Sequence, residues 1–203
     1  MQVQLFELHP TQLSVGYQQV YTKEKKIKKL NKSDRKNFLK ERAVPVVIGP
    51  ENRMYLVDHH HLCRAVYNLD LDEVYVTILD NCEDMSIDNF WDYMVKKEYV
   101  WLYNNSGKFL SLNEFLDLLP KHIKYLKDDP YRSIAGVVRK QGGYQKVMKP
   151  FTEFVWAEYF RQRLDLPNVY KEFPDDVVNS ALKLAKLPEA SHLPGYQGGD
   201  RLI

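Results

Sequence analysis

Residues 54–65 read MYLVDHHHLCRA, and this stretch decides the fold that the sequence predicts. Its apolar beginning, Met54–Val57, has the length and composition of a buried strand. Three of the six histidines follow Asp58 directly, at positions 59–61. Apolar residues then recur with helical spacing, at Leu62, Ala65, Val66 and Leu69. We therefore expect ionisable side chains where a strand meets a helix, a position at which backbone N–H groups and side chains can face one ligand.

The chain before and after this stretch alternates between strand and helix patterns. Further strands are expected at Val3–Leu8, Val44–Ile48 and Glu73–Leu79. A helical segment from Tyr21 to Arg42 lies between the first two, with a break near residues 31–33 where Ser33 would cap the second piece. These elements predict a small mixed sheet with helices packed on it.

The second half has a helical character. Ser86 is placed to cap a helix, and Ser111 with Glu114 has the Ser-x-x-Glu spacing of a capping box. Prolines divide this region into short helices, the last of them at Asp175–Leu187. The sequence thus predicts an α+β fold, with an α/β domain over residues 1–104 and a mainly helical region over 105–203. The tail from about residue 188 lacks periodicity and is expected to be loose.

The composition is that of an ordinary globular protein. Of the 203 residues, 44% are hydrophobic and 28% are charged. No apolar stretch approaches the ~20 residues that cross a bilayer, and Met1–Leu8 lacks the features of a secretory signal. Cys63 and Cys82 form no CxxC motif and are expected to be small buried hydrophobes. These features predict a cytoplasmic protein without a membrane partner.

Basic residues are concentrated in one segment, although the net charge is only +2. Between Lys23 and Arg42 there are ten Lys or Arg residues and three acids, a local charge of +7. Such a segment can meet phosphates of DNA, RNA or a nucleotide. The alternative is a solvated face of an amphipathic helix whose core stripe is Ile27, Leu30, Phe38 and Leu39.

The histidine cluster predicts an anion site. With Asp58 as the N-cap, His59, His60 and His61 would occupy the first helical turn, where N–H groups and the helix dipole favour an anion. Arg64 follows His60 by four residues and would share its face. We expect all three histidines and Arg64 to bind phosphate. Asp58, His60 and His61 are the candidate catalytic residues, because an imidazole can donate to phosphate or move a proton.

Two other interpretations of the cluster stay open. Two of the histidines with Asp58 could hold a metal in an irregular turn, although successive helical residues rarely all reach one ion. The cluster could also be purely structural. We assign no metal ligand.

Several segments together resemble the ParB/sulfiredoxin superfamily, and in particular a ParB-like branch whose members are labelled as nucleases. The resemblance covers roughly residues 3–196. It lies in HPTQL at 9–13, DHHHLCRA at 58–65, DDPYRS at 128–133 with Gly136, QGGY at 141–144, and PFTEF at 150–154 with Trp156.

This resemblance implies a small sheet with helices whose histidine-and-arginine junction holds nucleotide phosphates. Relatives include chromosome-partitioning proteins that bind CTP and DNA, sulfiredoxins that use ATP, and free-serine kinases that use ATP or ADP. The implied ligand is a nucleotide (ATP, ADP or CTP, with Mg²⁺) or a phosphorylated small molecule. The chain departs from the pattern: His59 or His60 stands where glycine is usual, and Leu62 stands where arginine is usual. Cys63 lies on the wrong side of the histidines for a sulfiredoxin.

Three further residues are candidates for substrate contact or support. Gln12 follows the first strand, near the position of a substrate loop in the relatives. Asp129 precedes Pro130 and would cap a helix, or would face the nucleotide site with Arg132. No glutamate occurs between Glu7 and Glu24, where free-serine kinases have a catalytic one.

Two classes of function follow. The preferred one is an enzyme of phosphoryl transfer or phosphodiester cleavage. The alternative is a non-catalytic, nucleotide-gated or DNA-binding module of the chromosome-partitioning type that uses Lys23–Arg42. The second half shows no helix-turn-helix pattern, which disfavours sequence-specific DNA binding.

Overall fold

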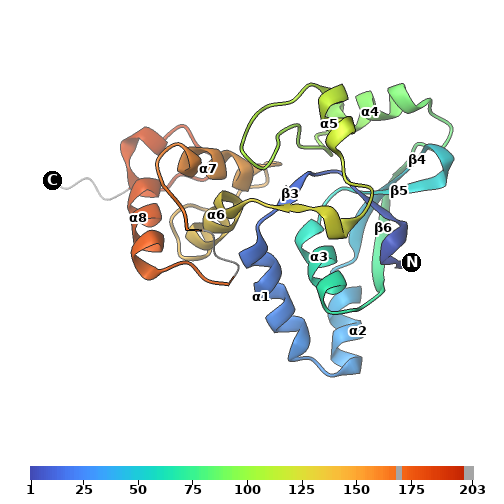
Figure 1. Ribbon diagram of the computed structural model, residues 1–203, viewed down its shortest axis with the longest axis horizontal. Helices are drawn as coiled ribbons and strands as arrows, with labels where there is room; N and C mark the ends of the chain where they lie inside the picture. The colour runs from blue at the N-terminus through green and yellow to red at the C-terminus, as the bar shows by residue number, and fades with distance from the viewer. Residues whose placement is uncertain (168–170, 199–203) are drawn as a thin grey trace. The chain divides into compact units, whose positions relative to one another are not determined.

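The computed structural model describes residues 1–167 and 171–198, which form two compact units (Figure 1). The first unit comprises Met1–Val15 and Val20–Asp128, and the second comprises Gly16–Gln19 with the chain from Asp129. The domain boundary expected after residue 104 stays a prediction, because a compact unit is not shown to fold by itself. Among the described residues, no helix is both long and apolar enough to cross a membrane.

A mixed five-stranded sheet forms the centre of the first unit. Its strands lie in the order β1 (Gln2–Gln4), β6 (Glu73–Asn81), β4 (Val44–Gly49), β5 (Arg53–Leu56) and β2 (Leu8–Pro10). The β4–β6 and β2–β5 pairs are parallel, whereas β1–β6 and β4–β5 are antiparallel. A separate two-stranded sheet pairs β3 (Ser14–Val15) with β7 (Lys127–Asp128). The predicted small mixed sheet is confirmed.

The first predicted strand is in fact two strands on opposite edges of this sheet. A 3₁₀ helix, η1 (Leu5–Glu7), separates β1 from β2. The Glu7 carboxylate accepts a hydrogen bond of 2.7 Å from the Gln4 N–H, which closes this turn. The apolar pattern of residues 3–8 indicated burial correctly, but it could not reveal a change of edge.

Helices cover both faces of the five-stranded sheet (Figure 1). Helices α2 (Lys32–Lys40) and α3 (His60–Asn68) pack against β6. Val47 and Tyr55 lie in a core cluster with Phe90, Trp91 and Met94 of α4 (Ile87–Lys96). The remaining elements of this unit are α1 (Tyr17–Lys28, which begins among residues counted with the second unit), η2 (Pro50–Asn52), α5 (Leu112–Leu118) and η3 (Ile123–Tyr125).

The basic segment forms two amphipathic helices, α1 and α2. Its expected core stripe is confirmed: Ile27, Phe38 and Leu39 are buried and Leu30 is half-buried. The predicted cap at Ser33 is wrong. Helix α2 begins earlier, because the Asn31 side chain accepts a 2.9 Å hydrogen bond from the Asp34 N–H.

The second unit is mainly helical, as predicted. It contains α6 (Pro130–Lys140), α7 (Thr152–Arg161), α8 (Asp175–Lys186) and the 3₁₀ helix η4 (Pro188–Ala190). Trp156 is fully buried at its centre and stacks on Tyr144 with 4.3 Å between ring centroids. Trp156 also anchors the region after α8, since its Nε1–H donates to the Pro194 carbonyl at 2.8 Å.

The tail expected to be loose is packed over the described residues 188–198. Ala190 and Leu193 belong to the core of the second unit, and Tyr196 forms a β-bridge with Tyr144. The reason is that short turns can bury side chains without repeating a helical or strand period. Residues 199–203 of that predicted tail lie outside the described residues.

Candidate functional site

The junction between β5 and α3 turns on His59. This residue has φ 69° and ψ 19°, a left-handed conformation, and it is the N-cap of α3. Its carbonyl accepts hydrogen bonds from the N–H groups of Leu62 and Cys63, at 2.8 and 3.0 Å. The prediction of Asp58 as N-cap is therefore wrong. Its carboxylate instead accepts the His59 N–H at 2.6 Å, and the first helical turn begins at His60.

His60 lies in the interior of the first unit. Its side chain is 1% exposed, and its Nε2 accepts a hydrogen bond of 3.1 Å from the Thr11 N–H. The Thr11 hydroxyl donates to the Leu56 carbonyl at 2.6 Å. An Nε2 that accepts this bond has no proton to give to a phosphate, so in this conformation His60 joins the end of β2 to the junction. Its predicted catalytic and phosphate-binding roles stay predictions.

His59 has a fixed ring orientation. Its Nδ1 lies 3.2 Å from the carbonyl oxygen of Arg42, and the residue as a whole is half-exposed to solvent. Because a carbonyl oxygen can only accept, Nδ1 is the donor and carries the proton of the neutral ring. Nε2 of His59 therefore has the lone pair that a general base or a ligand to a cation needs.

Asp58 and His61 complete the solvent-accessible part of the junction. Asp58 is exposed and His61 is half-buried in the first turn of α3. The Asp58 charge also raises the pKa of the fully buried Cys63 thiol, after the larger effect of burial, and Lys23 opposes it. The Arg42 carbonyl lies at the start of α3, against the His59 ring. The C-terminal end of the basic segment, at Arg42, therefore contacts the junction.

Arg64 holds a neighbouring part of the chain. Its Nη1 donates to the carbonyls of Ile123, Lys124 and Leu126 at 3.2, 2.6 and 3.2 Å, and its Nε donates to Asn68 at 3.0 Å. These contacts fix η3 against α3. A phosphate at Arg64, as predicted from sequence, would compete with these carbonyls, and this role also stays a prediction.

Gln12 lies near the histidines because its neighbour in sequence, Thr11, contacts His60. It is buried and follows Thr11, whose N–H contacts His60. The HPTQL and DHHHLCRA segments, 49 positions apart at Thr11 and His60, therefore meet at the end of β2.

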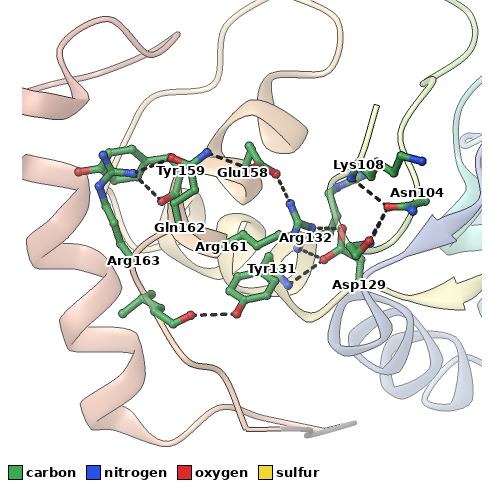
Figure 2. Close-up of polar contacts among 12 residues, drawn as sticks. Asn104, Lys108, Asp129, Tyr131, Arg132, Glu158, Tyr159, Arg161, Gln162 and Arg163 are labelled. Atoms are coloured by element: carbon green, nitrogen blue, oxygen red, sulfur yellow. Dashed lines mark hydrogen bonds and ion pairs between the residues drawn. The ribbon is translucent and has the colours of Figure 1, made fainter. Parts of the chain in front are cut away.

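Asp129 and Arg132 belong to the second unit and take part in a network there (Figure 2). Asp129 caps α6, accepting from the N–H groups of Tyr131 and Arg132 at 3.0 and 3.4 Å. Its other oxygen accepts from Arg161 at 2.7 Å, and Arg161 pairs with Glu158 at 2.6 Å. Burial raises the pKa of Asp129, while Arg161 and then Arg132 act in the opposite direction. The capping interpretation of Asp129 is confirmed.

Arg132 is almost fully buried. Its side chain is 4% exposed, and its guanidinium carbon lies 3.1 Å from the centroid of the Phe154 ring. This environment is a cation–π contact inside the second unit. Substrate contact by Gln12, Asp129 or Arg132 stays a prediction.

The described residues contain no group of three or more His, Cys, Asp or Glu side chains arranged to hold a metal. Mg²⁺ is often held by one carboxylate together with phosphate oxygens and water. The exposed Asp58 could supply that one carboxylate.

Sequence reasoning missed two contributors to the junction. Thr11 lies inside the HPTQL segment, and a threonine just after a strand is a signal for a hydrogen bond to a neighbouring strand. The Arg42 contribution is a backbone carbonyl, for which no side-chain signal exists.

A mixed five-stranded sheet with a histidine-bearing strand-to-helix junction, followed by a helical unit, defines an α+β protein of the ParB/sulfiredoxin type. Residues 1–162 match the family described as "Putative ParB-like nuclease". The chain belongs to this ParB-like nuclease family. It is also similar to protein Atu1540 from Agrobacterium tumefaciens, whose crystal structure superposes with a TM-score of 0.87 at 36% sequence identity. That similarity covers 98% of this chain and 97% of the other. No curated protein matches the sequence.

Proposed function

We propose that the protein is a hydrolase of phosphodiesters and that the β5–α3 junction is its active site. Membership in the ParB-like nuclease family supports the reaction class. The observation that carries the choice of site is the contact between the His59 ring and the Arg42 carbonyl. It orients a potential base at the end of the basic segment, where the substrate's negative charge would be attracted.

The proposed chemistry is attack of water on phosphorus. Nε2 of His59 takes a proton from the water as the new P–O bond forms, and the ester P–O bond breaks. His61 donates to a phosphate oxygen at the α3 N-terminus and supplies the proton that the leaving oxygen needs. Asp58 orients the water, or binds Mg²⁺ that the substrate brings. His60 positions the turn through Thr11.

His59→Asn is the sharpest variant for this proposal. Asparagine tolerates the left-handed conformation, and its amide can donate to the Arg42 carbonyl, but it has no basic nitrogen. We expect hydrolysis of bis(4-nitrophenyl) phosphate and of labelled single-stranded DNA to fall by about 10²–10⁴-fold. In His61→Ala the rate of hydrolysis should fall by a factor in the same range. Both substrates are assayed with Mg²⁺ and with EDTA.

His192→Ala is the matched control, because His192 is exposed and belongs to the second unit. It should leave the rate unchanged. Equal rates in wild type, His59→Asn and His61→Ala, or no hydrolysis by the wild type under either condition, would refute the proposal.

Nucleotide binding is a part of the proposal that needs its own assay. ATP, ADP and CTP with Mg²⁺, each with and without free serine, are followed by phosphorus NMR. Turnover that is lost in His61→Ala would favour phosphoryl transfer over diester cleavage. Line broadening without turnover would indicate a nucleotide that is bound as a regulator.

A non-catalytic nucleic-acid-binding function is the second candidate. It is favoured by the exposure of the lysines of α1, α2 and the turn between them, among them Lys25, Lys26, Lys28 and Lys29. Such a surface attracts a phosphate backbone irrespective of its sequence.

A further inference from the structure

A second group of basic side chains lies on the β2 edge of the first unit. His9 of β2 and Tyr55 of β5 are register partners, and their ring centroids are 5.6 Å apart. Arg53 is two residues before Tyr55 on the same strand, so it projects from the same face. The segment η3 packs against β2 and brings His122 and Lys124. These four basic residues come from three separate elements.

The η3 part of this group is held in place. Arg64 donates to three carbonyls of residues 123–126. The His122 Nδ1 accepts a 3.1 Å hydrogen bond from the Lys124 N–H, so the neutral ring carries its proton on Nε2. The Tyr67 ring meets the His122 ring edge-on, with 5.5 Å between centroids. His122 therefore presents an N–H donor in a defined orientation.

The positive charges of this group act on one another. The pKa of His9 is lowered by burial and then by Arg53 and His122. The pKa of His122 is lowered by burial and then by Lys124 and Arg64. Glu51 forms an ion pair with the half-exposed Arg53 and offsets one of these charges. The group therefore has an excess of cationic or potentially cationic side chains.

We propose that His9, Arg53, His122 and Lys124 form a second anion-binding site, which takes the dianionic phosphate of a phosphomonoester. An arriving dianion would stabilise the protonated form of both imidazoles and turn them into charged donors. Arg53 and Lys124 supply permanent positive charge. A diester, with a single negative charge, would gain about half of this attraction. The site includes none of the residues 58–61 and does not depend on the proposed hydrolase activity.

Histidine NMR tests the site directly, with inorganic phosphate as the probe. The Cε1–Hε1 signals of all six histidines are assigned with single His→Asn variants and titrated with pH, with and without phosphate, at constant ionic strength. We expect phosphate to raise the pKa of His9 and of His122 and to leave His192 unchanged. Lys124→Ala should weaken the phosphate affinity about fivefold. Lys171→Ala, an exposed lysine of the second unit, should not.

The same spectra separate this proposal from the proposed function. Phosphate effects at His59 and His61 alone would support the junction and overturn the second site, whereas effects at His9 and His122 establish the second site whatever the hydrolase assay shows. Equal losses of affinity in Lys124→Ala and Lys171→Ala would also overturn it. A nucleoside monophosphate should act at lower concentration than a dinucleoside monophosphate, and equal responses would refute the preference for a monoester.

Discussion

Asp129 shows how much one buried carboxylate can stabilise. It is 3% exposed, caps α6 through two backbone N–H groups and pairs with Arg161. In Asp129→Ala the cap is lost and Arg161 loses its buried carboxylate partner, while its ion pair with Glu158 remains. We expect the free energy of unfolding to fall by about 3–5 kcal/mol, measured by urea denaturation.

Asp176→Ala is the control for that substitution. Asp176 lies in the first turn of α8 but is exposed, so its loss should cost only about 0.3–1 kcal/mol. Equal losses in the two variants would mean that burial and the Arg161 pair add nothing to the cap.

His9 and His122 should make stability depend on pH. Both have a pKa below the ordinary value of 6.5, with burial as the main cause. The unfolded chain therefore binds more protons than the folded one as pH falls below about 6.5. We expect the free energy of unfolding to decrease from pH 7 toward acid and to level off below the folded pKa values. His9→Asn with His122→Asn should flatten this slope, and an unchanged slope would show that other groups cause it.

Three consecutive histidines differ more in environment than their sequence suggests. The sequence predicted correctly that they stand between a strand and a helix. It could not predict that His60 is buried while His61 is half-buried, because His60 contacts Thr11, which follows β2 and lies 49 positions away in the chain. Nor could it predict the left-handed His59, since the cost of that conformation is offset by contacts formed only in the folded chain.

At the scale of elements, Arg64 is the link between α3 and η3. A lysine keeps the charge, but it lacks the Nε–H that donates to Asn68 and the planar guanidinium that this second bond holds in place, with Nη1 against the three carbonyls. In Arg64→Lys we expect faster amide hydrogen exchange in residues 123–126 and a loss of about 1–3 kcal/mol in stability. Arg35→Lys, on α2, serves as the control. Unchanged exchange in residues 123–126 would show that η3 does not need the guanidinium.

Element boundaries were predictable where the signal is local. Ser86 caps α4 and Ser111 with Glu114 forms the predicted capping box of α5, because both motifs use residues three positions apart. The break between β1 and β2 was not predictable, since it depends on which sheet edge each strand joins. The prediction of Ser33 as the cap of α2 failed because Asn31 and Ser33 can both cap a helix, and the sequence does not favour one over the other.

At the scale of the whole molecule, the basic helices should determine how salt affects nucleic-acid binding. In a variant with Lys25, Lys26, Lys28 and Lys29 changed to Ala, the slope of log affinity against log salt should flatten. Each lost contact with a duplex phosphate lowers its magnitude by about 0.9. The measurement is a titration of labelled duplex at several salt concentrations.

A variant with the same change in net charge provides the control for that titration. It replaces four other exposed lysines with Ala, namely Lys96, Lys97, Lys171 and Lys183. If both variants flatten the slope equally, the effect comes from net charge and the four lysines at the end of α1 form no specific surface.

The overall class of the molecule was predictable and the packing of its end was not. Alternating strand and helix patterns, followed by helices, indicate an α+β fold whatever the details of pairing. The region after Pro188 is buried by Trp156 and Tyr144, whose rings stack in the core of the second unit. Such contacts join residues far apart in the chain, so they produce no helical or strand period in the sequence near residue 188.

The burial of Cys63 gives the molecule a built-in reporter. Its thiol is inaccessible and its pKa is raised, so an alkylating reagent can reach it only when the chain around α3 opens. In a Cys82→Ala background, the rate of alkylation measures how often the chain around α3 opens. Any ligand that binds only the closed form must lower the alkylation rate of Cys63 by the factor 1 + [L]/Kd. Candidate ligands can thus be ranked by a chemical labelling rate, without an assay of any reaction.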